Sequence, residues 1–408
     1  MKTVRGMQDF LGEPARKKQF VEDTCRQVFE SYGFEPLQTP ALEELETLTK
    51  KGSAGTAIVN EIYSFKDKGD RDVGMRFDLT VPLARVVATN PALKKPFKRY
   101  QIAQVWRYDR PQAGRFREFT QADVDIIGAP TVSADFECVM IAVDILKKLG
   151  VKGKVKVNNR KLLEDFAVAC GVKREQAKEC FRCLDKLDKI GEKEVQKELK
   201  EKQIKTEIVS KLSCSLKDMQ KIIPASEGLK EISELFSLAK KIGVEEFVEF
   251  DLSLARGLEY YTGNVFEVKS EGPSIGGGGR YDNLISDMGG AKVPAVGISF
   301  GVERVMGLVK ETQGAMTQIF IAPFSRDFFE SALLLCQKIR AIGISTEIDL
   351  MERSVSKNLE FASGKKIPYI IVYGENEEKE KTFNLKNMSN GKQEKIRFTE
   401  LEKLSKLI

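Results

Sequence analysis

The sequence predicts an α+β protein in which an antiparallel sheet is flanked by helices, interrupted by a helical segment and followed by a separate α/β domain. Three observations support this prediction. Two β-favouring segments, residues 100–108 and 115–127, flank a loop with proline and glycine, which is typical of an antiparallel hairpin. Residues 161–247 change to a lysine- and glutamate-rich helical pattern. After residue 318, strand and helix patterns alternate, which favours a mainly parallel α/β domain.

The composition is typical of a globular protein with sizeable cores. The 408 residues are 42% hydrophobic, without an apolar run of transmembrane length. The seven cysteines are scattered and lack the spacing of a disulfide framework. The N-terminal residues lack the positive-then-apolar pattern of a signal peptide. We therefore expect a cytoplasmic protein with reduced thiols and no membrane partner.

The sequence contains no histidine, which limits the chemistry available to it. Ser-His-Asp and Cys-His catalysis, imidazole general bases and H-E-x-x-H metal sites are excluded. One C-x-x-C pair, Cys180 and Cys183, lies in a helical pattern but has no second pair of zinc ligands. We expect no zinc, and we expect any catalysis to use arginine, carboxylate, tyrosine or metal.

The formal net charge of +6 is modest, and its distribution does not identify a partner. Basic and acidic residues nearly balance in residues 161–247 and again in residues 318–408. Charge alone therefore does not indicate nucleic-acid binding in either segment. The helical segment fits a solvated bundle about as well as an RNA-contacting module.

The N-terminal part begins with a predicted helix at residues 14–32, because apolar residues recur there at spacings of three and four before Gly33. A short strand at residues 34–38 follows. This helix is as consistent with packing on its own sheet as with a dimer interface, since any amphipathic helix must bury one face.

Residues 73–81, VGMRFDLTV, predict a strand that ends at Pro82, whose missing N–H stops ladder pairing. Side chains alternate along a strand, so Asp78 and Thr80 would share one face. The Asp78 carboxylate could hold an amino group directly. A salt bridge at the sheet edge is the alternative.

The second segment of the hairpin carries a gradient of charge along one face. Five polar residues share that face by alternation: Arg115, Arg117, Gln121, Asp123 and Asp125. Arginines in this array suit a polyanion such as ATP, because guanidinium groups offer rigid donor forks to phosphate oxygens. Asp125 and Gln121 can receive a polar or cationic substrate beside it. A solvated strand face with ion pairs is the alternative.

The remaining elements are predicted from periodicity and from glycine and proline positions. They are helices at residues 135–149, 177–187 and 192–201, and strands at 154–157, 265–268 and 295–300. Four glycines, residues 276–279, permit close backbone approach to a ligand, with a structural turn as the alternative. Arg304 falls in the first turn of a helix, where a cation is unfavourable unless an anion is near.

The C-terminal part follows a linker predicted at residues 310–317. Its strands are predicted at residues 319–322, 345–349 and 369–373, and its helices at 328–342 and 355–362.

Four motifs, found in order along the chain, resemble those of class II aminoacyl-tRNA synthetases. Residues 106–119, WRYDRPQAGRFREF, resemble motif 2 in its histidyl-tRNA synthetase form. Residues 254–263, LARGLEYYTG, resemble a signature of histidyl enzymes and their paralogues. SIGGGGRYD at residues 274–282 is a third match, and GISFGVER at residues 297–304 resembles motif 3. The helix, strand and proline near the N-terminus resemble motif 1, which in the family builds the dimer interface.

The resemblance implies a domain plan and an activity. A class II synthetase-like catalytic domain would span residues 1–160 and 248–312, with a helical insertion at 161–247, a linker at 313–317 and an anticodon-binding-like domain at 318–408. The activity would be ATP-dependent activation of L-histidine, with Mg²⁺, to histidyl-adenylate, followed by transfer to the 3′ end of tRNA(His) by a homodimer. The alternative is a paralogue, the histidine-sensing regulatory subunit of ATP phosphoribosyltransferase. Those proteins generally lack the C-terminal domain and have degraded arginine motifs. This sequence has the C-terminal domain, and its arginine motifs are intact.

The resemblance also implies residue roles. Arg107 would bind the α-phosphate, Arg115 and Arg304 the outer phosphates, and Arg256 would stabilise charge on the transferred phosphoryl group. Asp109 is a further ATP-binding candidate where the family has glutamate, and Glu259 stands where aspartate is usual. Histidine would be bound by Asp78, Thr80, Gln121, Asp125, Tyr260, Tyr261 and Tyr281. Arg110 and Gln112 are candidates for the tRNA acceptor end, and no metal ligand is assigned.

Overall fold

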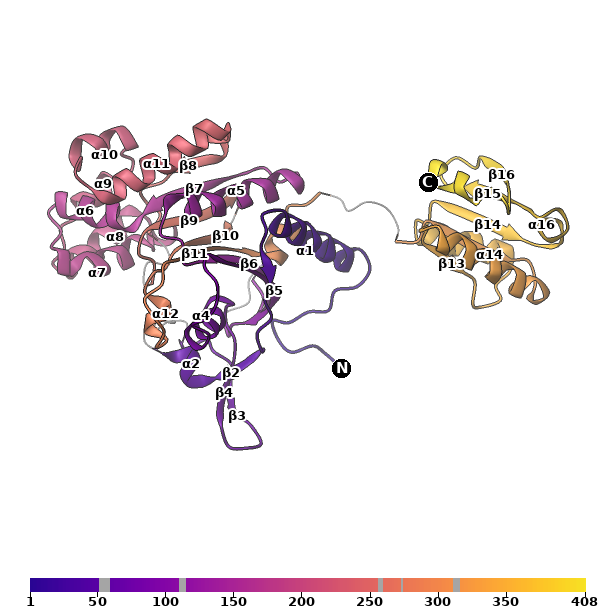
Figure 1. Ribbon diagram of the computed structural model, residues 1–408, viewed down its shortest axis with the longest axis horizontal. Coiled ribbons are helices and arrows are strands. Elements are labelled where there is room, and N and C mark those ends of the chain that lie inside the picture. The colour runs from indigo at the N-terminus through magenta and orange to yellow at the C-terminus, as the bar shows by residue number, and fades with distance from the viewer. Residues whose placement is uncertain (51–58, 110–114, 256–259, 273, 311–315) are drawn as a thin grey trace. The chain divides into compact units, whose positions relative to one another are not determined.

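The structure is a computed structural model that describes residues 1–50, 59–109, 115–255, 260–272, 274–310 and 316–408 (Figure 1). It divides into two compact units, Met1–Glu311 and Thr312–Ile408. Each unit has a sheet and a hydrophobic core of its own. Most of the predicted linker, residues 313–317, lies outside the described residues. No helix in the described ranges combines the length and apolar character needed to cross a membrane.

The first unit is built on an eight-stranded sheet in the order β1-β5-β6-β11-β10-β9-β7-β8 (Figure 1). Neighbouring strands are antiparallel except at the two edges, where β1 pairs with β5 and β7 with β8 in parallel. The strands are β1 Glu35–Pro36, β5 Phe97–Trp106, β6 Glu118–Ile127, β7 Gly153–Asn159, β8 Val248–Phe250, β9 Asn264–Ser270, β10 Ser274–Arg280 and β11 Ala295–Gly301. The predicted antiparallel sheet and its central hairpin, β5–β6, are confirmed.

A smaller sheet, in the order β2-β4-β3, lies in the same unit. Its strands are β2 Leu42–Glu44, β3 Ser64–Lys66 and β4 Asp72–Met75. The helices of the unit outside residues 161–247 are α1 Glu13–Ser31, α2 Leu45–Thr49, α4 Thr80–Thr89, α5 Val132–Lys148, α12 Leu284–Asp287 and α13 Val302–Met306.

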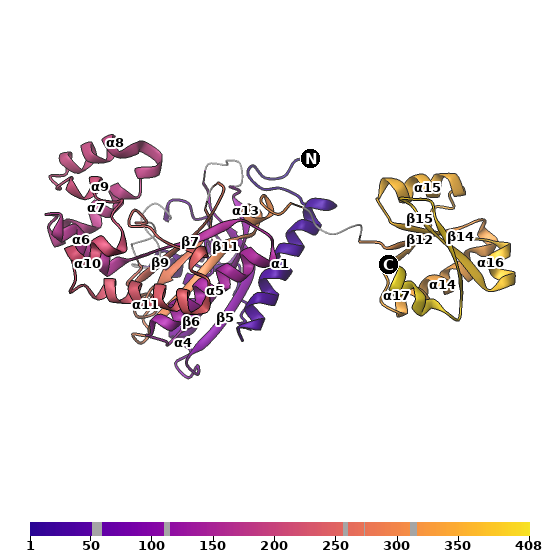
Figure 2. The same ribbon diagram turned by 90° about the horizontal axis from the view of Figure 1, so that it is seen from above.

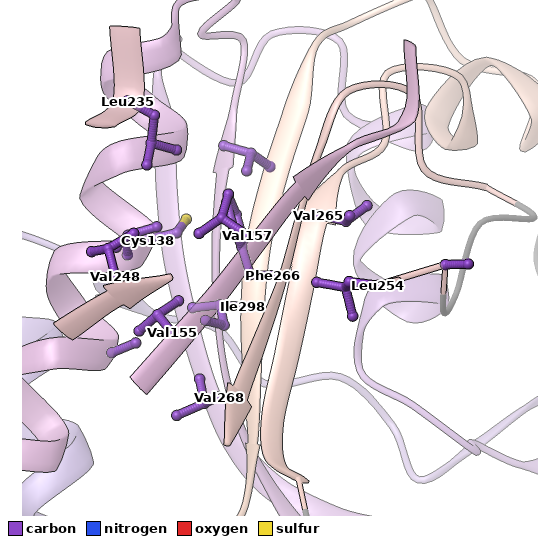
Figure 3. Close-up of a cluster of buried hydrophobic side chains, with 14 of the residues drawn as sticks. Cys138, Val155, Val157, Leu235, Val248, Leu254, Val265, Phe266, Val268 and Ile298 are labelled. Carbon is purple, nitrogen blue, oxygen red and sulfur yellow. The ribbon is translucent and has the colours of Figure 1, made fainter. Parts of the chain in front are cut away.

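The two faces of the large sheet differ in character because side chains alternate along each strand. Ala122, Val124 and Ile126 of β6 point into the main core, which they share with α1 and α5. Figures 1 and 2 show α5 and α11 along this side of the sheet, and Figure 3 shows part of the core, including Cys138 of α5 and Val157 of β7. The opposite face carries the polar residues of β6, and α4 and α12 cover one end of it.

The predicted helical segment consists of α6 Arg160–Ala169, α7 Ala177–Leu184, α8 Leu187–Glu201, α9 Glu207–Ser210, α10 Leu216–Ile222 and α11 Glu227–Ile242. Its buried residues, such as Leu162 and Leu235, belong to the same apolar cluster as Val155 and Val268 of the sheet. Cys180 and Cys183 are buried free thiols in α7. Of these helices, α6 and α11 contact the apolar side of the large sheet, and the others pack mainly on neighbouring helices.

The strand predicted at residues 73–81 is wrong in its second half. β4 ends at Met75 and α4 begins at Thr80. The Oδ1 atom of Asp78 accepts a hydrogen bond from the Val81 N–H at 3.1 Å and so satisfies a donor in the first turn. Pro82 follows in that turn, where the helix needs no N–H. The proline therefore belongs to a helix start, and Asp78 and Thr80 lie at this start and not on one strand face.

The second unit is an α/β domain with a five-stranded sheet in the order β13-β12-β14-β15-β16. Its elements are β12 Ile319–Pro323, α14 Phe329–Ala341, β13 Thr346–Ile348, α15 Val355–Gly364, β14 Tyr369–Tyr373, α16 Glu375–Glu380, β15 Thr382–Asn387, β16 Gln393–Arg397 and α17 Leu404–Leu407. The three predicted strands are parallel to one another, but β15 and β16 add an antiparallel hairpin. The prediction of a mainly parallel sheet is thus corrected, although the Asn390-Gly391 pair is a hairpin signal in the sequence.

Candidate active site

The polar face of the large sheet is organised by strand register. Asp125 lies opposite Arg99 of β5 on one side and Gly297 of β11 on the other. Two residues earlier in β6, Asp123 lies between Gln101 and Ser299. The two neighbouring strands thus place the cation of Arg99 on one side of the Asp125 carboxylate and a glycine, Gly297, on the other.

A cavity of about 370 Å³ is lined by residues of this face. Six of the residues predicted from the sequence line it: Arg107, Asp109, Arg115, Gln121, Tyr261 and Arg304. Three of the four successive glycines, Gly276, Gly277 and Gly278, also line it and lie within strand β10, not in a turn. Because glycine has no side chain, this part of the wall is backbone that a ligand can approach closely.

The cations of the cavity are held by backbone and aromatic groups. Arg107 donates from Nε to the Phe77 carbonyl at 2.9 Å, and its guanidinium lies 5.3 Å from the centre of the Phe119 ring. Arg304 donates from Nη1 to the Ser274 carbonyl at 3.0 Å. Such contacts fix cations in place before a ligand arrives, which suits phosphate binding.

Arg115 lies at the more exposed end of the cavity. It pairs with Asp109, with 3.6 Å between Nη1 and Oδ2, and both side chains are nearly half exposed. Glu61 also lines the cavity, and burial raises its pKa, as does the nearby Asp109 carboxylate, while Arg107 and Arg115 oppose the rise. The outer cavity thus contains carboxylates as well as cations.

Asp125 is the centre of a buried polar cluster beside the cavity. Its Oδ2 atom is 2.6 Å from Nη2 of Arg99, and its Oδ1 atom accepts a hydrogen bond from the Tyr281 hydroxyl. Burial raises the pKa of Asp125, and the Arg99 cation and the Tyr281 hydroxyl oppose that rise. Arg99 itself has 0% of its surface exposed. This arrangement compensates a buried carboxylate on both oxygens.

Gly297 makes room for this carboxylate. A Cβ atom at Gly297 would overlap Oδ1 of Asp125 and lie 2.6 Å from its Cγ. Real Cβ atoms essentially never approach other atoms within 3.0 Å. The first glycine of the GISFGVER motif is therefore required by the side chain of the neighbouring strand.

Tyr281 is positioned by the residue before it. Arg280 is buried, donates from Nε to both carboxylate oxygens of Asp135 at 3.2 Å, and donates from Nη1 to the Ala129 carbonyl at 3.0 Å. These bonds tie the end of β10 to the start of α5. Next to Tyr281 lie two more aromatic residues: the Tyr260 ring is 4.5 Å from that of Tyr261 and 6.3 Å from that of Tyr281.

Two further carboxylates near Asp125 have raised pKa values. Burial raises the pKa of Asp78 to about 6, and burial raises that of Asp123 to about 7; the Asp125 charge adds to both shifts, while Arg99 opposes them. Gln121 donates from Nε2 to Ser299 Oγ at 2.7 Å. Asp78, Asp123, Asp125, Tyr260 and Tyr281 thus form one polar cluster next to Gln121 and Tyr261 of the cavity.

Several predicted site residues lie outside the described residues. They are Arg256, Glu259, Arg110 and Gln112. Thr80 is described and is partly buried at the first position of α4. The predicted roles of all these residues stay predictions.

Sequence reasoning missed Arg99, Glu61 and Phe119 as members of the site. For Arg99 a signal was available, because the hairpin register places alternating polar residues 99 and 101 opposite 125 and 123. No comparable signal marks Glu61, since it comes to the cavity from outside the large sheet. Among the described residues, no cluster of cysteine and acidic side chains is arranged to hold a metal ion.

Comparison with known proteins places this chain in a family. A family model described as histidyl-tRNA synthetase matches residues 6–305, and one described as an anticodon binding domain matches residues 318–406. Histidine–tRNA ligase 2 of Shouchella clausii is 35% identical over 418 residues, covering 97% of this chain and 98% of that protein. Histidine–tRNA ligase of Cytophaga hutchinsonii is 38% identical and covers 97% of each.

A solved structure agrees with the sequence relatives. The crystal structure of histidyl-tRNA synthetase from Nostoc sp. PCC 7120 is 29% identical, covers 100% of this chain and 99% of that chain, and superposes with a TM-score of 0.88. The predicted class II fold with its C-terminal α/β domain is thereby confirmed. The chain belongs to the histidyl-tRNA synthetase family and is, by that membership, an aminoacyl-tRNA synthetase.

Proposed function

We propose that this chain activates L-histidine with ATP to form histidyl-adenylate and pyrophosphate, and then transfers the histidyl group to the 3′ end of tRNA(His). The observation that carries the proposal is the junction of two regions: a cavity with Arg107, Arg115 and Arg304, and a buried cluster around Asp125. The first suits a polyphosphate, and the second suits an imidazole ring. The histidine–tRNA ligase names of the sequence relatives support the same activity.

The activation step needs no base from the protein. An oxygen of the histidine carboxylate attacks the α-phosphorus of ATP, the bond to the bridging oxygen breaks, and its electron pair leaves with pyrophosphate. Because the nucleophile is already an anion, the absence of histidine side chains is no obstacle. ATP enters as its Mg²⁺ complex, which partly neutralises the leaving group.

The cations then have distinct tasks. Arg107, next to Phe119 in the cavity, holds the α-phosphate, while Arg115 and Arg304 hold the outer phosphates. Asp109 keeps Arg115 oriented through its ion pair. The family resemblance adds Arg256 as the group that stabilises charge on the phosphoryl group in the transition state.

Two carboxylates recognise histidine, one at its imidazole ring and one at its α-amino group. Asp125 accepts a hydrogen bond from a ring N–H, with Tyr261 and Tyr281 beside it, and Asp78 receives the α-amino group with Gln121 and Thr80 nearby. A competitor without ring nitrogens would not supply the hydrogen bond that Asp125 accepts from the ring, and a missing bond of this kind in a buried site costs roughly 10⁴-fold or more in discrimination.

The second unit completes the proposal. The match of residues 318–406 to an anticodon binding domain supports tRNA binding by this unit, and the resemblance of α1 and β1 to motif 1 supports a homodimer. Residues 161–247 are proposed as an insertion in a catalytic domain formed by residues 1–160 and 248–312. The regulatory-subunit alternative is not favoured, because the C-terminal domain and the arginine-lined cavity are both present.

A histidine-dependent ATP–pyrophosphate exchange assay tests the proposal. We expect exchange with L-histidine and Mg²⁺, little exchange with other amino acids, and charging of tRNA(His) in a second assay. Histidine binding without exchange would instead support a sensing role. Exchange driven by another amino acid would contradict the assignment of the buried cluster.

A further inference from the structure

Arg99 is a buried cation that none of the predicted roles uses. It lies on β5 with 0% of its surface exposed, and Nη2 contacts both Oδ2 of Asp125, at 2.6 Å, and the Leu79 carbonyl, at 3.1 Å. Burying a guanidinium is costly unless it is paired, so such a group is retained where it balances a charge. Its partner is the carboxylate assigned to the imidazole ring.

The surroundings of Asp125 show how its charge is balanced. One oxygen faces the Arg99 cation and the other accepts from the Tyr281 hydroxyl. On the β11 side, Gly297 and Ser299 contribute no charge. The titratable and charged groups around Asp125 are Arg99 of β5, Asp123 of β6, Asp78 before α4, Tyr261 before β9, Tyr281 after β10, and Cys138 of α5 behind the sheet.

We propose that Arg99 is a positioning residue that keeps Asp125 a charge-compensated carboxylate, so that the site binds histidine with a neutral imidazole ring and rejects imidazolium. This inference rests on the proposed histidine site. A carboxylate already paired with a cation still accepts a hydrogen bond from a neutral ring N–H. A second positive charge would gain little attraction from this paired carboxylate, and Arg99 would repel that charge at short range.

Arg99 and the carboxylates beside it keep atoms without a hydrogen bond. In the described part of the chain these atoms are Nε and Nη1 of Arg99, Oδ1 of Asp123 and Oδ2 of Asp125, and the last is balanced by its ion pair with Arg99 alone. Arg107 adds a second cation close to Asp78. An imidazolium ring would therefore enter a site whose acids already face two guanidinium groups.

The ionisation of the ligand can be separated from that of the protein with a matched pair of ligands. Histidine titrates near neutral pH, whereas 1,2,4-triazolylalanine has a similar ring that stays neutral over the same range. Changes in the protein's own carboxylates affect both ligands. The ratio of the two dissociation constants, measured by isothermal titration calorimetry, therefore reports the charge of the bound imidazole.

For the native protein we expect histidine affinity to fall about tenfold relative to the triazole between about pH 7.5 and about pH 5.5, as the neutral imidazole fraction falls. A ratio that stays constant or moves in favour of histidine at low pH would overturn the inference. If histidine does not bind at any pH, the proposed function fails instead, so the two failures are distinguishable.

Substitution of Arg99 tests its own role. In Arg99→Met the buried carboxylate lacks its cation and should prefer imidazolium. The fall in histidine affinity relative to the triazole at low pH should therefore disappear or reverse. Arg99→Lys keeps a positive charge and should keep the native pH profile with weaker affinity. An Arg99→Met protein with the native profile, or an Arg99→Lys protein without it, would remove Arg99 from the mechanism.

Arg76→Met is the matched control for loss of a buried guanidinium. Arg76 donates to the Gln104 carbonyl at 2.9 Å and to the Thr39 carbonyl at 2.7 Å. Its removal should lower stability but leave the pH profile of the ligand ratio unchanged. A change of profile in Arg76→Met equal to that in Arg99→Met would assign the effect to structural damage and overturn the proposal.

Discussion

Replacing Gly297 by alanine tests whether the register of the sheet builds the histidine site. The new methyl group would overlap Oδ1 of Asp125 and lie 2.6 Å from Cγ of Asp125 and from the Val124 carbonyl oxygen. The backbone of β6 is held between β5 and β11, so the Asp125 side chain must give way. It would then lose its alignment with Arg99 and Tyr281.

The size of the effect follows from these contacts. Overpacking of a tightly packed site costs about 1–3 kcal/mol of stability. A hydrogen bond to a charged group contributes about 1.5–3 kcal/mol, so a displaced carboxylate should weaken histidine binding about 10- to 150-fold. ATP affinity should change little, because Arg107 and Arg304 are held by the Phe77 and Ser274 carbonyls, which the substitution does not touch.

Calorimetry of both ligands, together with thermal unfolding, measures the outcome. Gly301→Ala is the matched control on the same strand, because its nearest new contact would be Cδ of Arg304 at an ordinary 3.6 Å. It should leave histidine affinity unchanged. A folded Gly297→Ala protein with native histidine affinity, or an equal loss in Gly301→Ala, would refute the reasoning.

Four further predictions concern single groups and one domain. Asp125→Asn should weaken histidine binding about 10- to 150-fold in calorimetry with ATP binding nearly intact, because an amide lacks the charged acceptors; equal loss of both ligands would indicate misfolding. Arg256→Ala should lower the rate of pyrophosphate exchange about 10²–10³-fold with little change in histidine affinity; a raised KM with native turnover would contradict its transition-state role. Deleting residues 318–408, a separate compact unit, should spare much of the exchange and abolish tRNA charging; lost exchange would show that this unit supports the catalytic part. Burial raises the pKa of Asp78 to about 6 and that of Asp123 to about 7, both above the unfolded value, so protonation favours the folded state. Stability should therefore fall as pH rises from about 4, the ordinary aspartate value, to about 7, and Asp123→Asn should flatten the pH dependence of the unfolding midpoint; an unchanged slope would show that Asp123 is not the titrating group.

The predictable part of the fold depended on local patterns. Alternation and turn residues located β5 and β6, and apolar spacing with Gly33 located α1, because these signals act within a few residues of chain. The same local rules failed at Pro82, which is compatible with both the end of a strand and the first turn of a helix. The hydrogen bond from Val81 to Asp78 decides between them, and it forms only when the helix does.

The candidate site divides in the same way. Arg107, Arg115 and Arg304 were found from motifs, since residue type and order survive in the sequence. Glu61 was not found, because it comes to the cavity from outside the large sheet and its proximity depends on packing. Phe119 was overlooked although it lies in the 106–119 motif and on the strand face of Gln121.

The sequence by itself determined which residue types are available: arginines for phosphate, carboxylates and tyrosines for a polar ring, and no imidazole for catalysis. Only the tertiary structure decided that Gly297 of β11 lies beside Asp125 of β6. The physical reason is that strands distant in sequence are paired by the burial of their apolar faces, which are nearly alike from strand to strand. The polar partners on the opposite face then follow from a register that no single segment specifies.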